Sequence, residues 1–121
     1  MLRQCATVLG LFATAVMAHH STAPYDLIHG TLIGGSVTKF EWMNPHSHIY
    51  VDVTAEEGAV EHWVIEIESP LVLQRLGWSK DSLKAGDKIL VMGSRAKNGS
   101  FVMRGVTIDL PDGRKLRALG E

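Results

Sequence analysis

Short runs of alternating apolar and polar residues, separated by turn signals, fill this chain from residue 31 onward. Every odd-numbered residue in the ranges 49–53 and 63–67 is isoleucine, valine or tryptophan, and most of the residues between them are polar. A period of two is that of a strand that buries one face. The repeated pattern therefore predicts a mainly β chain with short strands.

One helix interrupts the strands. Ser69 is a typical N-cap, Pro70 suits the first helical turn, and Gly77 can end the helix. Strands are expected within residues 31–42, 48–53, 62–68, 87–95, 100–110 and 114–119. Three strands, a helix and two more strands is the order of a small five-stranded OB-like barrel, here with an extra C-terminal strand. An open β sandwich fits the lone helix less well.

The turn between the second and third strands sets their register. A three-residue loop at Glu57-Gly58-Ala59 would place Val53 opposite Trp63 and keep every inward residue opposite another. The same register predicts Glu68 opposite His48.

The first 18 residues have the pattern of a secretory signal peptide. Arg3 precedes an apolar run from residue 6 to 16, and Val16 and Ala18 occupy the positions that signal peptidase reads. We expect export to the periplasm or the medium, with no membrane span. Residues 19–30 are predicted to be an N-terminal arm and residues 31–121 a single domain. Cys5 is the only cysteine, so the processed chain would have no disulfide or thiolate ligand.

Charge argues against nucleic acid as a partner. Without the leader the chain would have 11 basic and 13 acidic side chains, since Arg3 is the only charged residue removed. Nucleic-acid-binding domains usually have a basic excess or a dense basic patch.

Several motifs resemble those of a known family. They include Trp42-Met43-Asn44-Pro45-His46, Glu68-Ser69-Pro70, Gly77-Trp78-Ser79 and Leu110-Pro111-Asp112-Gly113. Together with the leader that ends in Ala18-His19-His20, they resemble the small exported bacterial proteins of domain of unknown function 6152. The resemblance implies export but no activity. More loosely, the composition is similar to that of periplasmic copper and silver chaperones with an OB barrel.

Histidines suggest a metal site. His46 and His48 are two residues apart, so on a strand they would share a face and could converge on one ion. If the leader is cleaved after Ala18, His19 offers its α-amine and its ring. His20 and Met43 are further candidate ligands. Glu68 is a candidate ligand or a group that orients His48.

Two alternatives stay open at this point. Cleavage one residue earlier would leave Ala18-His19-His20, in which His20 chelates copper(II) with the intervening amides. The arm, moreover, must fold back onto the barrel for His19 to meet His46 and His48. Without these contacts, the histidines are ordinary surface residues.

Two functions from different classes fit these observations. The first is an exported copper-binding protein that buffers or delivers the metal. The second is a metal-free periplasmic binding or assembly module that presents the face of the second and third strands to a protein partner, peptide or glycan. No catalytic motif is present, so we do not expect an enzyme.

Overall fold

The computed structural model describes residues 24–120 of the chain. These residues form β1 (Tyr25–Glu41), β2 (His48–Thr54), β3 (Val60–Glu66), α1 (Pro70–Arg75), β4 (Lys88–Ala96), β5 (Val102–Asp109) and β6 (Lys115–Arg117). The prediction of a small, mainly β fold is confirmed, with one helix between the third and fourth strands and an extra strand at the C-terminus. No helix in this part of the chain is long and apolar enough to cross a membrane.

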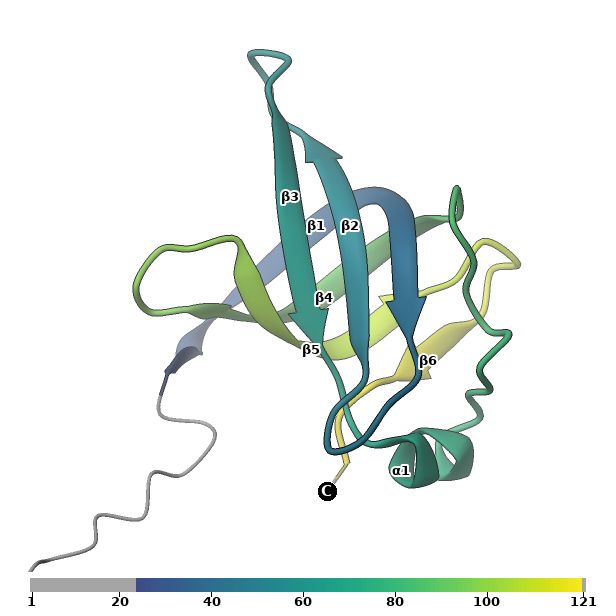
Figure 1. The fold of residues 1–121 in the computed structure, drawn as a ribbon. Coiled ribbons are helices and arrows are strands. Elements are labelled where there is room, and N and C mark those ends of the chain that lie inside the picture. The colour runs from purple at the N-terminus through teal and green to yellow at the C-terminus, as the bar shows by residue number, and fades with distance from the viewer. Residues whose placement is uncertain (1–23, 121) are drawn as a thin grey trace, which may run out of the picture.

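The first five strands pair in a closed ring (Figure 1). The order of hydrogen-bonded neighbours is β3-β2-β1-β4-β5-β6, and β3 also pairs with β5. The β3–β5 pairing is parallel and short, from Val64 opposite Val102 to Glu66 opposite Arg104. All other pairings are antiparallel. Such a ring of five hydrogen-bonded strands is consistent with the predicted OB-like arrangement.

Strand β1 bends sharply and changes partner (Figure 1). It pairs with β4 up to Ser36 and with β2 from Ser36 onward. A Cβ on Gly35 would lie 2.3 Å from the carbonyl oxygen of Asp52, so only glycine allows the strands this close at the bend. This close approach explains why a glycine occupies position 35 in the bent strand.

The domain begins earlier than the sequence indicated. Strand β1 starts at Tyr25, where Tyr25 is opposite Ala96 of β4. Residues 25–30, which were expected in the arm, are therefore part of β1. The expected leader and the rest of the arm lie outside the described residues.

The hairpin of β2 and β3 has a different register from the predicted one. Val51, not Val53, is opposite Trp63, and Glu66, not Glu68, is opposite His48. The loop does contain three residues, but they are Glu56, Glu57 and Gly58, between Ala55 and Ala59, which hydrogen bond at 2.8 Å. Gly58 has a φ of 88°, so the glycine takes the last loop position, where a left-handed residue is needed.

A continuous apolar core fills the ring. Its members include Val37 of β1, Ile49 of β2, Ile65 of β3, Val91 of β4 and Met103 of β5, all buried. The alternation read from the sequence therefore points the correct residues inward, in either register.

The predicted helix is confirmed, with Ser69 at its N-cap and Pro70 in its first turn. Gly77 follows its end with a φ of 96°. Leu73 is buried in the core, and the Trp78 indole nitrogen donates to the carbonyl oxygen of Arg117 at 2.7 Å. These contacts fix the helix against the bottom of the ring in Figure 1.

Candidate functional site

The segment between β1 and β2 is held in place by Ser47. The Ser47 hydroxyl accepts from the amide of Met43 at 3.2 Å and donates to its carbonyl oxygen at 3.3 Å. The Ser47 backbone bonds to Ile67 and Glu68, which extends the β2–β3 pairing beyond His48. The residues on either side of this buried serine, His46 and His48, therefore have fixed backbone positions on the outward side of the sheet.

Both histidines lie beside one carboxylate. Glu66 is opposite His48 in the ladder, and its Oε1 is 3.2 Å from Nδ1 of His46. The His46 side chain is 29% exposed, so part of its ring reaches solvent. Among the described residues, Nδ1 of His48 is buried and has no hydrogen-bond partner.

Glu66 is the centre of a hydrogen-bond network. The Tyr25 hydroxyl donates to its Oε2 at 3.0 Å, and Nη1 of Arg104 donates to its Oε1 at 2.9 Å. Nη2 of Arg104 donates to Glu68 at 3.0 Å, and the Gly120 amide also donates to Glu68. Arg104 is only 8% exposed. Strands β1, β3 and β5 thus meet in one partly buried polar cluster.

The electrostatics of this cluster favour a cation. Glu66 and Glu68 contribute two negative charges, whereas Arg104 contributes one positive charge, so one negative charge remains beside the histidines when these are neutral. Burial, with the Glu66 carboxylate adding to the effect, raises the pKa of Tyr25 from 10.0 to about 12. The phenol therefore stays protonated and keeps donating to Glu66.

The predicted ligands are only partly brought together. His46 and His48 flank Glu66, whereas Glu68 is not opposite His48 and is bound to Arg104. Met43 is 42% exposed in the same segment as His46. His19 and His20 lie outside the described residues. Within residues 24–120, no group of three or more His, Cys, Asp or Glu residues is arranged to hold a metal ion.

Three residues of the network were missed by sequence reasoning. The predicted register placed Glu68 opposite His48, and the observed register, displaced by two residues, places Glu66 there. Arg104 reaches the site only through the parallel β3–β5 pairing, and Tyr25 was assigned to the arm. The polar residues between positions 62 and 68 were the only signal in the sequence. They do not indicate which side chains would bind them.

Further along the outward face of β2 and β3, the polar side chains pair with one another. The Lys39 ammonium lies 5.6 Å from the centre of the Tyr50 ring. His62 and Asp52 are in contact at 2.6 Å, with the His62 side chain 78% exposed. This face was the surface expected for a metal-free module.

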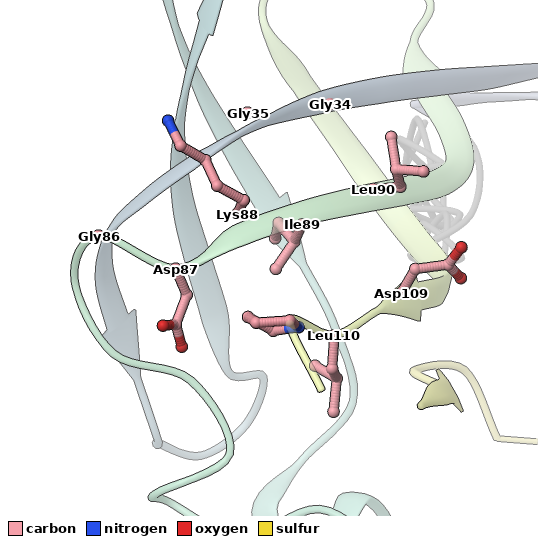
Figure 2. A pocket seen from close by; sticks show the side chains of 10 residues that line it. Gly34, Gly35, Gly86, Asp87, Lys88, Ile89, Leu90, Asp109 and Leu110 are labelled. Atoms are coloured by element: carbon pink, nitrogen blue, oxygen red, sulfur yellow. The ribbon is translucent and has the colours of Figure 1, made fainter. Parts of the chain in front are cut away.

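A groove of about 670 Å³ lies elsewhere, between β1, β4 and the end of β5. Figure 2 shows Leu90 and Asp109 towards one end of it and Asp87 and Lys88 towards the other. Gly34 and Gly35 form part of its lining. The groove shares no lining residue with the histidine cluster.

A family model matches residues 8–105, and its description is "Family of unknown function (DUF6152)". The chain belongs to this family. The match includes every side chain of the network around Glu66 in this DUF6152 protein, from Tyr25 to Arg104. No curated protein matches the chain in sequence.

Proposed function

We propose that this DUF6152 protein is an exported copper-binding protein that buffers or delivers the metal. His46 and His48 would be its ligands in the folded domain, and His19 would complete the site as the first residue of the processed chain. The contact between His46 Nδ1 and Glu66 is the observation that carries the proposal.

This contact determines which nitrogen of His46 is available. A carboxylate can only accept, and its negative charge 3.2 Å from Nδ1 favours the tautomer of a neutral His46 that has its hydrogen on Nδ1 and a lone pair on Nε2. Metal-binding histidines typically donate their other ring nitrogen to a carboxylate or carbonyl, which fixes both the tautomer and the ring. Arg104 and Tyr25 hold Glu66 in turn.

His48 and the local charge add support. The buried Nδ1 of His48 has no hydrogen-bond partner within residues 24–120, so no structural hydrogen bond occupies this atom. The excess negative charge of Glu66 and Glu68 over Arg104 would be offset by a bound cation. Both features suit a site that gains from a metal ion.

The types of donor atom favour copper over the other divalent first-row metals. Two imidazoles, with a terminal amine and ring, make a nitrogen-rich set, and affinity of such sites is highest for copper among divalent first-row metals. The exposed thioether of Met43 lies in the same segment and would favour copper(I). No thiolate is expected in the processed chain, since Cys5 is the only cysteine.

The test measures copper(II) and copper(I) binding by the chain that begins at His19, beside a His46→Ala/His48→Ala double variant. We expect one copper per chain in the unaltered protein and at least a hundredfold weaker binding in the double variant. His62→Ala is the matched control, because His62 is exposed and paired with Asp52. It should bind copper as the unaltered protein does.

Equal affinity in the double variant and the unaltered protein would exclude a site at these histidines. In that case the metal-free binding module would be the better interpretation. An unchanged melting temperature after one equivalent of copper would point the same way, because a ligand that binds only the folded state must stabilise it.

A further inference from the structure

Three large apolar side chains lie together on the outward face of β1 and β4. Leu32 is opposite Met92 in this pair of strands, and the two side chains are 61% and 41% exposed. Leu90, two residues before Met92 and therefore on the same face, is 46% exposed. A contiguous apolar patch of this kind indicates an interaction surface.

Glycines make the surface beside Leu90 hollow. Gly34 is opposite Leu90, and a Cβ on Gly34 would lie 2.9 Å from Cδ2 of Leu90. Leu90 thus occupies the space that a side chain at position 34 would need. The groove between β1, β4 and the end of β5 is lined by Gly34 and Gly35 on one side and by Pro111 on another. One surface therefore has both a projecting apolar side chain and a hollow next to it.

The two ends of the groove have opposite charges (Figure 2). At one end, the Lys88 ammonium donates to the Ser36 hydroxyl and contacts no carboxylate of residues 24–120. The carboxylate of Asp109 lies towards the other end. Asp87 does not neutralise Lys88, because its side chain points to the opposite side of the strand and accepts from the Lys84 amide at 3.0 Å.

This distribution of shape and charge fits a second copy of the same chain. A two-fold interface uses one surface twice, so each feature has to meet its complement on the other copy. When two copies pack antiparallel across the groove, Lys88 of each copy faces the partner's Asp109. Leu90 of each copy then enters the groove of the other. Asp109 also contacts Lys115 at 3.4 Å, but both side chains are partly exposed and such a pair contributes little.

We propose that this protein forms a two-fold symmetric dimer through the groove, with Leu90 near the centre and Lys88 paired with the partner's Asp109 at each end. The inference is independent of the copper function, because the groove shares no lining residue with the histidine cluster. The surface is small, so the dimer should be reversible, with a dissociation constant in the micromolar range.

Reversal of single charges tests the pairing. Sedimentation equilibrium would compare the processed chain with its Lys88→Glu and Asp109→Lys variants. Each substitution places like charges together at both ends of the dimer, so we expect at least tenfold weaker association. The double variant Lys88→Glu/Asp109→Lys restores opposite charges and should recover the dimer. Lys97→Glu is the matched control, since Lys97 is exposed and does not line the groove, and it should change nothing.

A mixture of the two single variants is the decisive sample. In a mixed dimer, one end pairs the two introduced charges, which have opposite signs, and the other end keeps the native pair. The Lys88→Glu and Asp109→Lys chains should therefore associate with each other about as tightly as the unaltered chain does with itself, although neither dimerises well alone. This result requires that position 88 of one copy meets position 109 of the other.

The apolar contact has a test of its own. Leu90→Asp should weaken dimerisation at least tenfold, because it places a charge where Leu90 packs in the groove. Val60→Asp is the matched control, since Val60 is 52% exposed on β3 and does not line the groove. It should leave the dissociation constant unchanged, and circular dichroism would show that both variants are folded.

A chain that stays monomeric at millimolar concentration would overturn the inference. A dimer that survives Leu90→Asp and both charge reversals would overturn it as well, because the copies would then meet through another surface. If the monomer instead sediments with vesicles of phosphatidylethanolamine and phosphatidylglycerol, the apolar patch contacts membranes and the inference is wrong. Copper affinity should be the same in Lys88→Glu and the unaltered protein, so failure of the copper function would leave the dimer in place.

Discussion

At the scale of single residues, Glu66 organises the candidate site. It accepts hydrogen bonds from Tyr25 and Arg104 and contacts His46, so side chains from three parts of the chain depend on one carboxylate. Arg104 is buried and its guanidinium donates to both Glu66 and Glu68, which offsets part of the cost of burying these charges. The histidines thus lie next to a hydrogen-bonded network of charged and polar side chains.

Tyr25 should make folding stability fall at high pH. Its pKa is raised from 10.0 to about 12 by burial and by Glu66, whereas an unfolded chain has the ordinary value. Below pH 10 the phenol is protonated in both states and its contribution is complete. As the pH rises from 10 to about 12, the unfolded chain loses the proton first, so this contribution is lost.

Urea unfolding from pH 9 to 12 would measure the effect, with Tyr25→Phe as the reference. The difference in free energy of unfolding between the two proteins should shrink across this interval. A constant difference would show that the Tyr25 phenol titrates alike in the folded and unfolded chains.

At the scale of elements, the β2–β3 hairpin decides which carboxylate meets His48. Two registers satisfy the same alternation, because a displacement of two residues keeps every inward side chain inward. The loop selects between them: its glycine occupies the last position, with a φ of 88°. Glu66 is consequently opposite His48, whereas Glu68 accepts a hydrogen bond from Arg104.

Replacement of Gly58 tests the role of this loop. A Cβ on Gly58 has nothing within 4 Å, so Gly58→Ala introduces backbone strain without a clash. We expect it to lower the free energy of unfolding by about 1 kcal/mol. Gly58→Asn should cost less, because asparagine tolerates the left-handed region. Urea unfolding of both variants would check this, and equal losses would argue against strain at φ.

At the scale of the whole molecule, closure of the ring brings the site together. Arg104 of β5 reaches Glu66 of β3 because these strands pair in parallel, although 38 residues separate the two side chains. Ile65 lies at this closure, opposite Ile49 on one side and Met103 on the other, and all three are fully or almost fully buried. The core and the site therefore depend on the same pairing.

Ile65→Ala should strongly destabilise the fold. Removal of a buried isoleucine side chain down to alanine costs about 2–5 kcal/mol, depending on how far the cavity collapses. Val60→Ala is the matched control, since Val60 is 52% exposed on the same strand, and it should cost about 0.5 kcal/mol or less. Urea unfolding would measure both, and similar values for the two variants would contradict the assignment of Ile65 to the core.

The sequence by itself determined the fold class, the position of the helix and the inward residues of β2 and β3. These follow from local rules: a period of two, the Ser69-Pro70 start of the helix, and glycines at turns. It also singled out His46 and His48. Each of these features is encoded within a few neighbouring residues.

Only the tertiary structure decided which polar groups support the histidines. The alternation of β2 and β3 is compatible with Glu66 or Glu68 opposite His48, and a single turn residue separates the two cases. Tyr25 and Arg104 join the site through pairings between strands distant in sequence, for which no local pattern exists. Their placement follows from closure of the ring, which is a property of the whole chain.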